Sequence, residues 1–323
     1  MADEAQTPNP VVELATQISR ARDADVLLYN GRIDRPFDDT VIDLVRKRRR
    51  RTNILLMLST YGGNPDAAYR IARCLQTHYT KFTVVVAGFC KSAGTLIVLG
   101  ANSVMLLDQA ELGPLDVQIR KDDELAEASS GLTPSTSLTS LREAAMEAFV
   151  GNYIRLKGGL LMTTKTAAEI ASGITVGLYQ PIMAQLDPMR LGEMERAVKV
   201  AWEYGNRLTQ RSQNLKEDAL GRLVAGYPSH EFVIDREEAK DLFKNVEDPA
   251  DSEKAFCELA HTMNRTPLHG PTGPYIFFMS QEIGDDDKPK DVDNADAHAE
   301  ELGAGEGSPS GEGSNGGPPP ARV

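Results

Sequence analysis

The chain has 323 residues, 41% of them hydrophobic and 25% charged, and its formal net charge is −12. These values are ordinary for a globular protein with one large core. The acidic balance argues against a broad nucleic-acid surface, which needs clustered lysine and arginine. The three cysteines have neither disulfide nor metal-type spacing, so a reducing, cytoplasmic environment is expected. No secretory signal is expected, and no apolar run approaches the length of ~20 residues that is needed to span a bilayer.

The N-terminal part of the chain predicts an arm followed by the first strand and helix of a core. Residues 1–24 form the predicted arm, with an amphipathic helix over 11–21. Residues 25–29 predict a strand, and residues 37–46 a helix preceded by proline. The basic run 46–51 could bind nucleic acid or anionic lipid. We favour the solvated end of a helix, because the run is short and directly precedes a buried strand.

The centre of the chain contains the same pattern twice, an apolar strand followed by a small-residue turn and a helix. The strands are predicted at 54–58 and 82–87, and a third follows at 103–107. The first turn carries Gly62 and Gly63, whose backbone N–H groups can approach a ligand closely because neither residue has a Cβ. The second turn carries Ser92 where a strand meets a helix. Together the turns predict a nucleophile beside an anion cradle.

The C-terminal half predicts a surface loop, several helices, one further strand and a tail. The acidic and hydroxyl-rich segment 120–139 is expected to be a loop that can act as a lid. Further elements are expected as helices at 140–156, 167–171, 191–213, 218–224 and 236–243, the last capped by Asp235, and as a turn and strand at 227–234. Residues 284–323 are rich in Asp, Glu, Gly, Ser and Pro, which predicts a disordered tail.

Four short motifs stand out in the chain. They are Thr60-Tyr61-Gly62-Gly63, Lys91-Ser92-Ala93-Gly94-Thr95-Leu96, Glu111-Leu112-Gly113-Pro114-Leu115-Asp116, and Tyr227-Pro228-Ser229-His230 with Arg236-Glu237-Glu238-Ala239. These motifs resemble the Clp-fold serine proteases, which include Clp peptidase, signal peptide peptidase A and, most closely, the serine dehydrogenase proteinase branch. The resemblance covers roughly residues 25–246. It implies an α/β fold, the Clp/crotonase-like ββα spiral with a mainly parallel sheet and helical additions, in a protease domain over residues 25–283.

The resemblance also implies roles for residues in the two turns. Ser92 would attack a scissile carbonyl while the amides of Gly62 and Ala93, with Gly63 beside them, hold the oxyanion. The alternative for Ser92 is that it only caps its helix. Asp108 stands where Clp peptidase has its histidine, so the general base is left open. The candidates are Lys121, Lys157, Lys165 and His230, while Lys91 is expected to project away from the serine hydroxyl, and Asp108 could orient a base or cap a turn.

The expected function is that of a serine peptidase acting on peptide or protein substrates and assembled as a homo-oligomer. The histidines lack ligand spacing and no dinucleotide or phosphate-loop fingerprint follows the first strand, so neither metal nor cofactor is expected. A catalytically inactive Clp-fold scaffold is the main alternative, because the base is not identified. A crotonase-type acyl-CoA enzyme is a weaker one, since that superfamily shares the two oxyanion amides.

Overall fold

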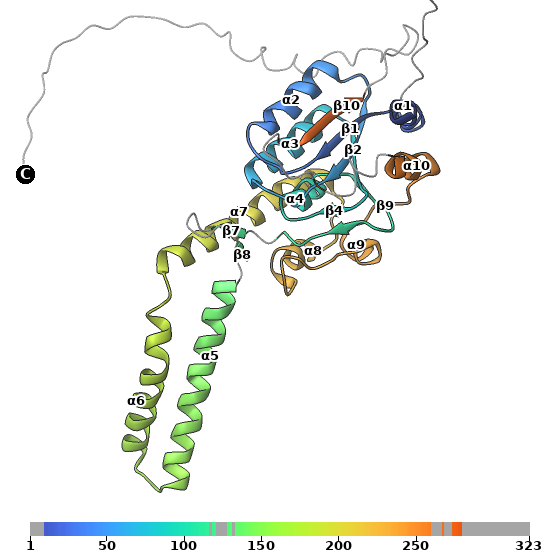
Figure 1. The fold of residues 1–323 in the computed structure, drawn as a ribbon. Helices are drawn as coiled ribbons and strands as arrows, with labels where there is room; N and C mark the ends of the chain where they lie inside the picture. Colours follow the sequence, from blue (N-terminus) through green and yellow to red (C-terminus); the bar gives the residue numbers. More distant parts are fainter. Residues whose placement is uncertain are drawn as a thin grey trace, which may run out of the picture. The chain divides into compact units, whose positions relative to one another are not determined.

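The computed structural model describes residues 10–115, 118–120, 128–130, 133–259, 267 and 273–279. The core contains a six-stranded sheet with the strand order β10-β1-β2-β3-β5-β9. Figure 1 shows this sheet among the helices that pack on it. The strands are β1 (Ala24–Asn30), β2 (Asn53–Ser59), β3 (Lys81–Val86), β5 (Ser103–Leu106), β9 (Val246–Glu247) and β10 (Tyr275–Met279). Neighbouring strands are parallel except β1 and β10, which are antiparallel. The predicted α/β class with a mainly parallel sheet is confirmed.

Alternate residues of the central strands face two helical layers, which is why these strands are apolar on both faces. Leu56 and Val84 belong to the core cluster covered by α2 (Phe37–Arg48), α3 (Pro65–His78) and α4 (Ala93–Leu99). Leu55 and Val85 belong to the cluster covered by α1 (Pro10–Arg22) and α10 (Asp251–Leu259). The arm helix predicted at 11–21 is therefore α1, and it packs on the sheet.

Side-chain caps begin two of the helices, and the cap at Asp235 is the one predicted from the sequence. Asn64 accepts a hydrogen bond from the Ala67 N–H at 3.0 Å, with Pro65 in the first turn of α3. Asp235 likewise accepts from the Glu238 N–H at 2.9 Å at the start of α9 (Arg236–Leu242). These caps satisfy amides that have no partner within the helix.

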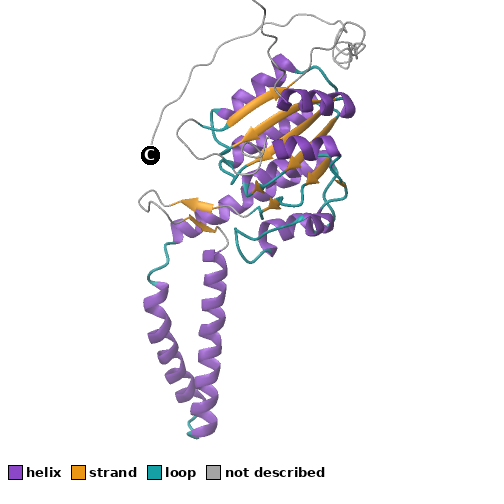
Figure 2. Cartoon of the chain, turned by 45° about the vertical axis from the view of Figure 1, so that its right-hand side comes forward, coloured by secondary structure: helices purple, strands orange, loops and turns teal. Residues whose placement is uncertain are grey.

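Smaller elements follow the third strand of the core. A two-stranded parallel sheet pairs β4 (Phe89–Cys90) with β6 (Glu111–Leu112), and an antiparallel pair joins β7 (Gln118–Arg120) to β8 (Ala128–Ser130). The helical elements of this part are α5 (Thr133–Ile154), η1 (Arg155–Gly159), α6 (Thr164–Met183), α7 (Pro188–Ser212), α8 (Ala219–Gly221) and η2 (Arg222–Gly226). Figures 1 and 2 show the long helices α5 and α6 side by side.

Several predicted boundaries are wrong. The segment 120–139 is not one loop, because β8 and the first turns of α5 lie within it. Helix α6 spans Thr164–Met183 and so runs far beyond the predicted 167–171, because the chain stays helical through Gly173, Gly177 and Pro181. Residues 227–234 form turns with one bridge, between Leu112 and Ile234, and no strand. The tail 284–323 lies outside the described residues. Among those described, no helix is long and apolar enough to cross a membrane.

Candidate active site

The turns that follow β2 and β4 are joined by backbone hydrogen bonds. The Thr60 N–H donates to the Phe89 carbonyl at 2.8 Å, and the Lys91 N–H donates to the Thr60 carbonyl at 3.0 Å. This ladder forms a parallel bridge between Thr60 and Cys90. It places the glycine turn directly beside the serine turn, as the sequence predicts for neighbouring strand ends.

The two turns approach each other so closely that only glycine fits at position 62. A Cβ atom on Gly62 would lie 2.7 Å from the Ser92 Cβ and 3.2 Å from the Ala93 nitrogen. Gly62 has a φ of +101° and Gly63 one of +145°, conformations that side chains with a Cβ rarely adopt. A Cβ on Gly63 would collide with the Ile33 carbonyl. The paired glycines are therefore required by both space and backbone conformation.

Ser92 has an unusual backbone conformation, with φ 52° and ψ −114°. Strain of this kind, when it occurs in a non-glycine residue, clusters at functional sites. It is also the feature of a serine on a sharp strand-to-helix turn, where the hydroxyl is presented to a substrate. The Ser92 side chain makes no capping hydrogen bond to α4. The alternative that Ser92 serves only as a helix cap is thus not supported.

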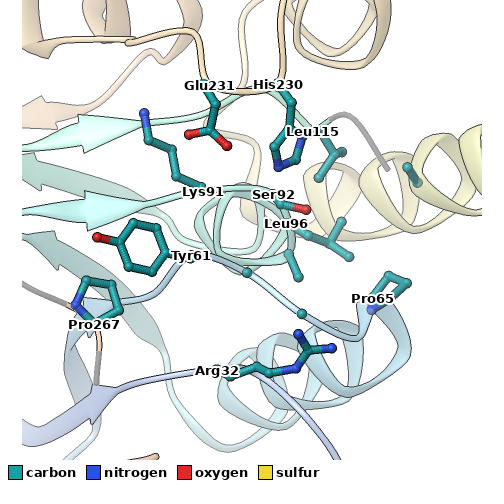
Figure 3. Close-up of a pocket in the computed structure, with 14 residues that line it drawn as sticks. Arg32, Tyr61, Pro65, Lys91, Ser92, Leu96, Leu115, His230, Glu231 and Pro267 are labelled. Atoms are coloured by element: carbon teal, nitrogen blue, oxygen red, sulfur yellow. The ribbon is translucent and has the colours of Figure 1, made fainter. Parts of the chain in front are cut away.

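Ser92 opens into a pocket of about 430 Å³ that contains both glycines of the first turn. Its lining combines apolar side chains with a few charged ones, which is typical of a binding site. Figure 3 shows the residues that line it, which are Arg32, Tyr61, Gly62, Gly63, Pro65, Lys91, Ser92, Ala93, Leu96, Leu115, Ala201, His230, Glu231 and Pro267.

The backbone amides of the site are not equally available to an oxyanion. The Gly62 N–H donates to the Thr60 hydroxyl at 2.9 Å, so it is already occupied. The prediction that the Gly62 amide holds the oxyanion therefore disagrees with this geometry. Within the described part of the chain, neither the Gly63 N–H nor the Ala93 N–H has a hydrogen-bond acceptor. The amide pair of the pocket is thus Gly63 and Ala93, both among the predicted residues.

His230 is the one predicted base candidate that the described structure brings to Ser92. It lies in the turn between η2 and α9, is 9% exposed, and its imidazole points toward Ser92 in Figure 3. The Phe232 N–H donates to the Ser229 carbonyl at 3.2 Å, and Ile234 pairs with Leu112, which together hold this turn over the pocket. A buried imidazole facing a serine hydroxyl is the arrangement required of a general base.

Lys91 is adjacent to the serine, but its ammonium points away from the Ser92 hydroxyl (Figure 3), as expected from the sequence. Its Nζ lies 3.1 Å from the Glu111 carboxylate and 3.4 Å from the Phe232 carbonyl. The Lys91 side chain is 3% exposed. Both contacts hold the Lys91 ammonium on the side of the serine turn away from the Ser92 hydroxyl. Lys91 instead ties β6 and the His230 turn to the serine turn.

The remaining candidates do not reach the pocket or are not described. Asp108 is exposed, faces Arg236 at 4.0 Å and does not line the pocket, so the structure does not bring it to the Ser92 side chain. Lys157 in η1 and Lys165 in α6 are exposed and do not line the pocket either, so the structure does not bring these base candidates to Ser92. Lys121 lies outside the described residues.

The sequence analysis missed three polar residues of the pocket, Arg32, Tyr61 and Glu231. Partial burial, together with the Glu111 and Glu231 carboxylates, raises the pKa of Tyr61. Its phenol therefore stays neutral at ordinary pH and cannot serve as a base. Arg32 follows the carboxyl end of β1, and this position relative to the parallel sheet is the signal that could have identified it.

No group of histidine, cysteine and carboxylate side chains suited to a metal is present among the described residues. The site consists of a serine hydroxyl, a facing imidazole and two amides. A serine hydroxyl, an imidazole and two amides are the groups that acyl transfer from a carbonyl substrate uses.

Comparison of the chain with known proteins identifies a family that it resembles. Residues 33–128 match the family model of the ClpP-like SDH-type serine proteinases. The predicted resemblance is confirmed for this segment, which contains both glycines, the serine and β4 to β7. The ClpP-like SDH-type family is one of serine proteinases, and the matched segment contains β2, β3 and β5 of the main sheet and the whole β4–β6 sheet.

Two curated relatives of the chain come from Methanocaldococcus jannaschii. Uncharacterized protein MJ0137 is 33% identical over 81 residues, which are 25% of this chain and 28% of the relative. Uncharacterized protein MJ1495 is 29% identical over 137 residues, which are 38% of this chain and 44% of the relative. The chain thus spans less than half the length of either curated relative.

Two solved structures of the 1510-N membrane-bound stomatin-specific protease are also similar. One, a serine-to-alanine mutant, has a TM-score of 0.29 and 17% identity over 45% of this chain and 67% of its own. The other, a lysine-to-alanine mutant in complex with a substrate peptide, has a TM-score of 0.28 and 19% identity over 45% of this chain and 63% of its own.

Proposed function

We propose that this protein is a serine peptidase in which Ser92 is the nucleophile and His230 the general base. The observation that carries the proposal is the strained Ser92 backbone beside the paired glycines, with the His230 imidazole facing the hydroxyl. The match to a serine proteinase family supports it. The amides of Gly63 and Ala93 are assigned to the oxyanion.

The groups of the pocket perform amide hydrolysis in two steps. His230 accepts the Ser92 hydroxyl proton as the Oγ–carbon bond forms, and the carbonyl oxygen takes the negative charge between the two amides. When the carbon–nitrogen bond breaks, the leaving amine takes the proton from the imidazolium. Water then attacks the acyl-enzyme with the imidazole again acting as base, which releases the acid and restores the serine.

The nucleophile is tested with a fluorophosphonate probe, which bonds covalently to an activated serine oxygen. We expect labelling of the wild type and none of Ser92→Ala, with peptide hydrolysis reduced about 10⁴-fold or more. Ser172→Ala, an exposed serine on α6, is the matched control and should label fully. Equal labelling of wild type and Ser92→Ala would remove Ser92 from this role.

The base is tested with His230→Gln, which keeps a polar side chain of similar size. We expect labelling and hydrolysis to fall by about a hundred-fold or more. A folded wild type that neither labels nor hydrolyses peptides would favour the inactive scaffold instead.

We also propose that the protein assembles as a homo-oligomer in a reducing, cytoplasmic environment. Cys74, Cys90 and Cys257 are all buried and none of them forms a disulfide, which supports a reducing environment. Light scattering of the purified full chain measures the mass of the assembly.

A further inference from the structure

The connection between α5 and α6 exposes leucines that no other described part of the chain covers. Residues 154–165, here called the hairpin tip, include η1 and the first turn of α6. Leu160 is 65% exposed and Leu161 87% exposed, the highest value among the described large hydrophobic side chains. Leu161 has a φ of +52°, which leucine rarely adopts. Single exposed leucines are normal on a protein surface, whereas Leu160 and Leu161 are adjacent and both exposed on one turn.

The hairpin tip is also basic in an otherwise acidic protein. It contains Arg155, Lys157 and Lys165 but no acidic residue, whereas the whole chain has a net charge of −12. None of these three cations forms an ion pair with a carboxylate of the described residues, and the Lys157 ammonium lies 5.7 Å over the ring of Tyr153. Charges separated by more than about 10 Å are largely screened at moderate salt, so the tip presents its own local positive field.

We propose that the hairpin tip docks on an anionic phospholipid surface, with Leu160 and Leu161 entering the headgroup–acyl boundary. Apolar side chains flanked by lysine and arginine are the features that hold peripheral segments at such a surface. Tyr153 adds an aromatic ring of the kind enriched at membrane interfaces. The helices themselves do not cross the bilayer, in keeping with the absence of a spanning helix among the described residues.

Charge disfavours a contact between the hairpin tips of two copies of the chain. A contact between two tips would bring three cations from each copy together, and juxtaposed like charges are unfavourable. An anionic bilayer instead neutralises all three while it covers the leucines. The proposal does not depend on the peptidase function, because it concerns residues that do not line the Ser92 pocket.

The test is co-sedimentation of the full chain with vesicles of phosphatidylcholine alone or enriched in phosphatidylglycerol. We expect binding only to the anionic vesicles and its loss at high salt. Lys157→Gln together with Lys165→Gln should lower the partition coefficient about 25-fold, or about five-fold per cation. Leu161→Glu should reduce it at least ten-fold, and its exposure means that folding is unaffected.

The matched control is Arg48→Gln with Arg50→Gln, which removes two exposed cations from the basic run at the end of α2. This variant should bind as the wild type does. Equal losses in the two double variants, or unchanged binding of Leu161→Glu, would overturn the proposal. The proposal would also be overturned if the wild type did not bind anionic vesicles and Leu161→Glu formed a smaller assembly than the wild type in light scattering.

Discussion

Gly62 and Ser92 are in contact across the two turns of the site, and a Cβ on Gly62 would lie 2.7 Å from the Cβ of Ser92. The backbone conformation at one of these residues thus limits the position of the other, although they are 30 positions apart in the sequence. The serine cannot keep its position unless the residue opposite has no side chain.

Gly62→Ala should therefore move Ser92 as well as strain the backbone at a φ of +101°. We expect a loss of about a hundred-fold in peptide hydrolysis and a destabilisation of about 1–3 kcal/mol. Gly151→Ala in α5 is the control, because a Cβ there meets nothing within 4 Å. That change should stabilise the helix by about 0.5–1 kcal/mol and leave hydrolysis unchanged. Full activity of Gly62→Ala would contradict the close contact.

Gly94→Ala tests how tightly α4 packs on the glycine turn. A Cβ at this position would lie 2.5 Å from the Thr60 Cγ2 and 2.9 Å from the Cys90 Sγ. We expect a destabilisation of about 1–3 kcal/mol in a denaturant titration, as in other overpacked cores. Adding Thr60→Ser removes the Cγ2 but keeps the hydroxyl that accepts from the Gly62 N–H. The double variant should recover part of the loss, and no recovery would refute this packing.

Arg22 is expected to stabilise the junction of α1 with α10. Its Nε lies 2.7 Å from the Glu253 carboxylate, which is 1% exposed, and its Nη1 lies 3.0 Å from Glu247. Arg22→Ala would leave a buried carboxylate without its cation, so we expect a loss of about 3 kcal/mol. Lys254→Ala, which breaks an exposed pair, should cost less than about 0.5 kcal/mol. Similar effects of the two changes in urea unfolding would show that burial of Glu253 does not matter.

Asp25 should make stability fall as pH rises. Burial raises the pKa of Asp25, against the hydrogen bonds from the Arg50 and Arg51 amides and the Tyr79 hydroxyl. The folded state then binds this proton more tightly than the unfolded state does. Its contribution is complete below the ordinary value of 3.8 and is lost as pH rises through the raised value.

Asp25→Asn removes that titration while keeping an oxygen acceptor. Relative to the wild type, the variant should therefore gain stability as pH increases above about 4. Urea unfolding of both proteins over a pH series measures the difference. A difference that stays constant, or that changes in the opposite direction, would contradict the assignment.

The cysteines should resist modification in the native protein. Burial raises the pKa of Cys74 to about 11, so at pH 8 about one thiol in a thousand is a thiolate. Cys90 is also buried, and its pKa is raised for the same reason. We expect slow reaction with a disulfide reagent in buffer and rapid reaction of all three thiols in denaturant. Rapid labelling of Cys74 without unfolding would disprove its burial.

Sequence patterns predicted the central strands and their helices because each depends on short-range chemistry. The apolar runs of β2 and β3 are buried on both faces, and Asn64 and Asp235 cap helices through bonds to residues three positions away. The later half was predicted less well. The second half of α6 has no capping or charge signal, and β10 pairs antiparallel at the sheet edge, which local periodicity does not reveal.

The sequence by itself determined a serine and two glycines at consecutive strand-to-helix turns, since apolar periodicity and the requirement for residues without a Cβ are local properties. Only the tertiary structure decided which groups meet there. The Thr60 hydroxyl accepts the hydrogen bond of the Gly62 amide, which leaves the Gly63 amide for an oxyanion. His230 rather than Asp108 faces Ser92. These choices depend on sheet register and on the packing of distant segments, which no short stretch of residues encodes.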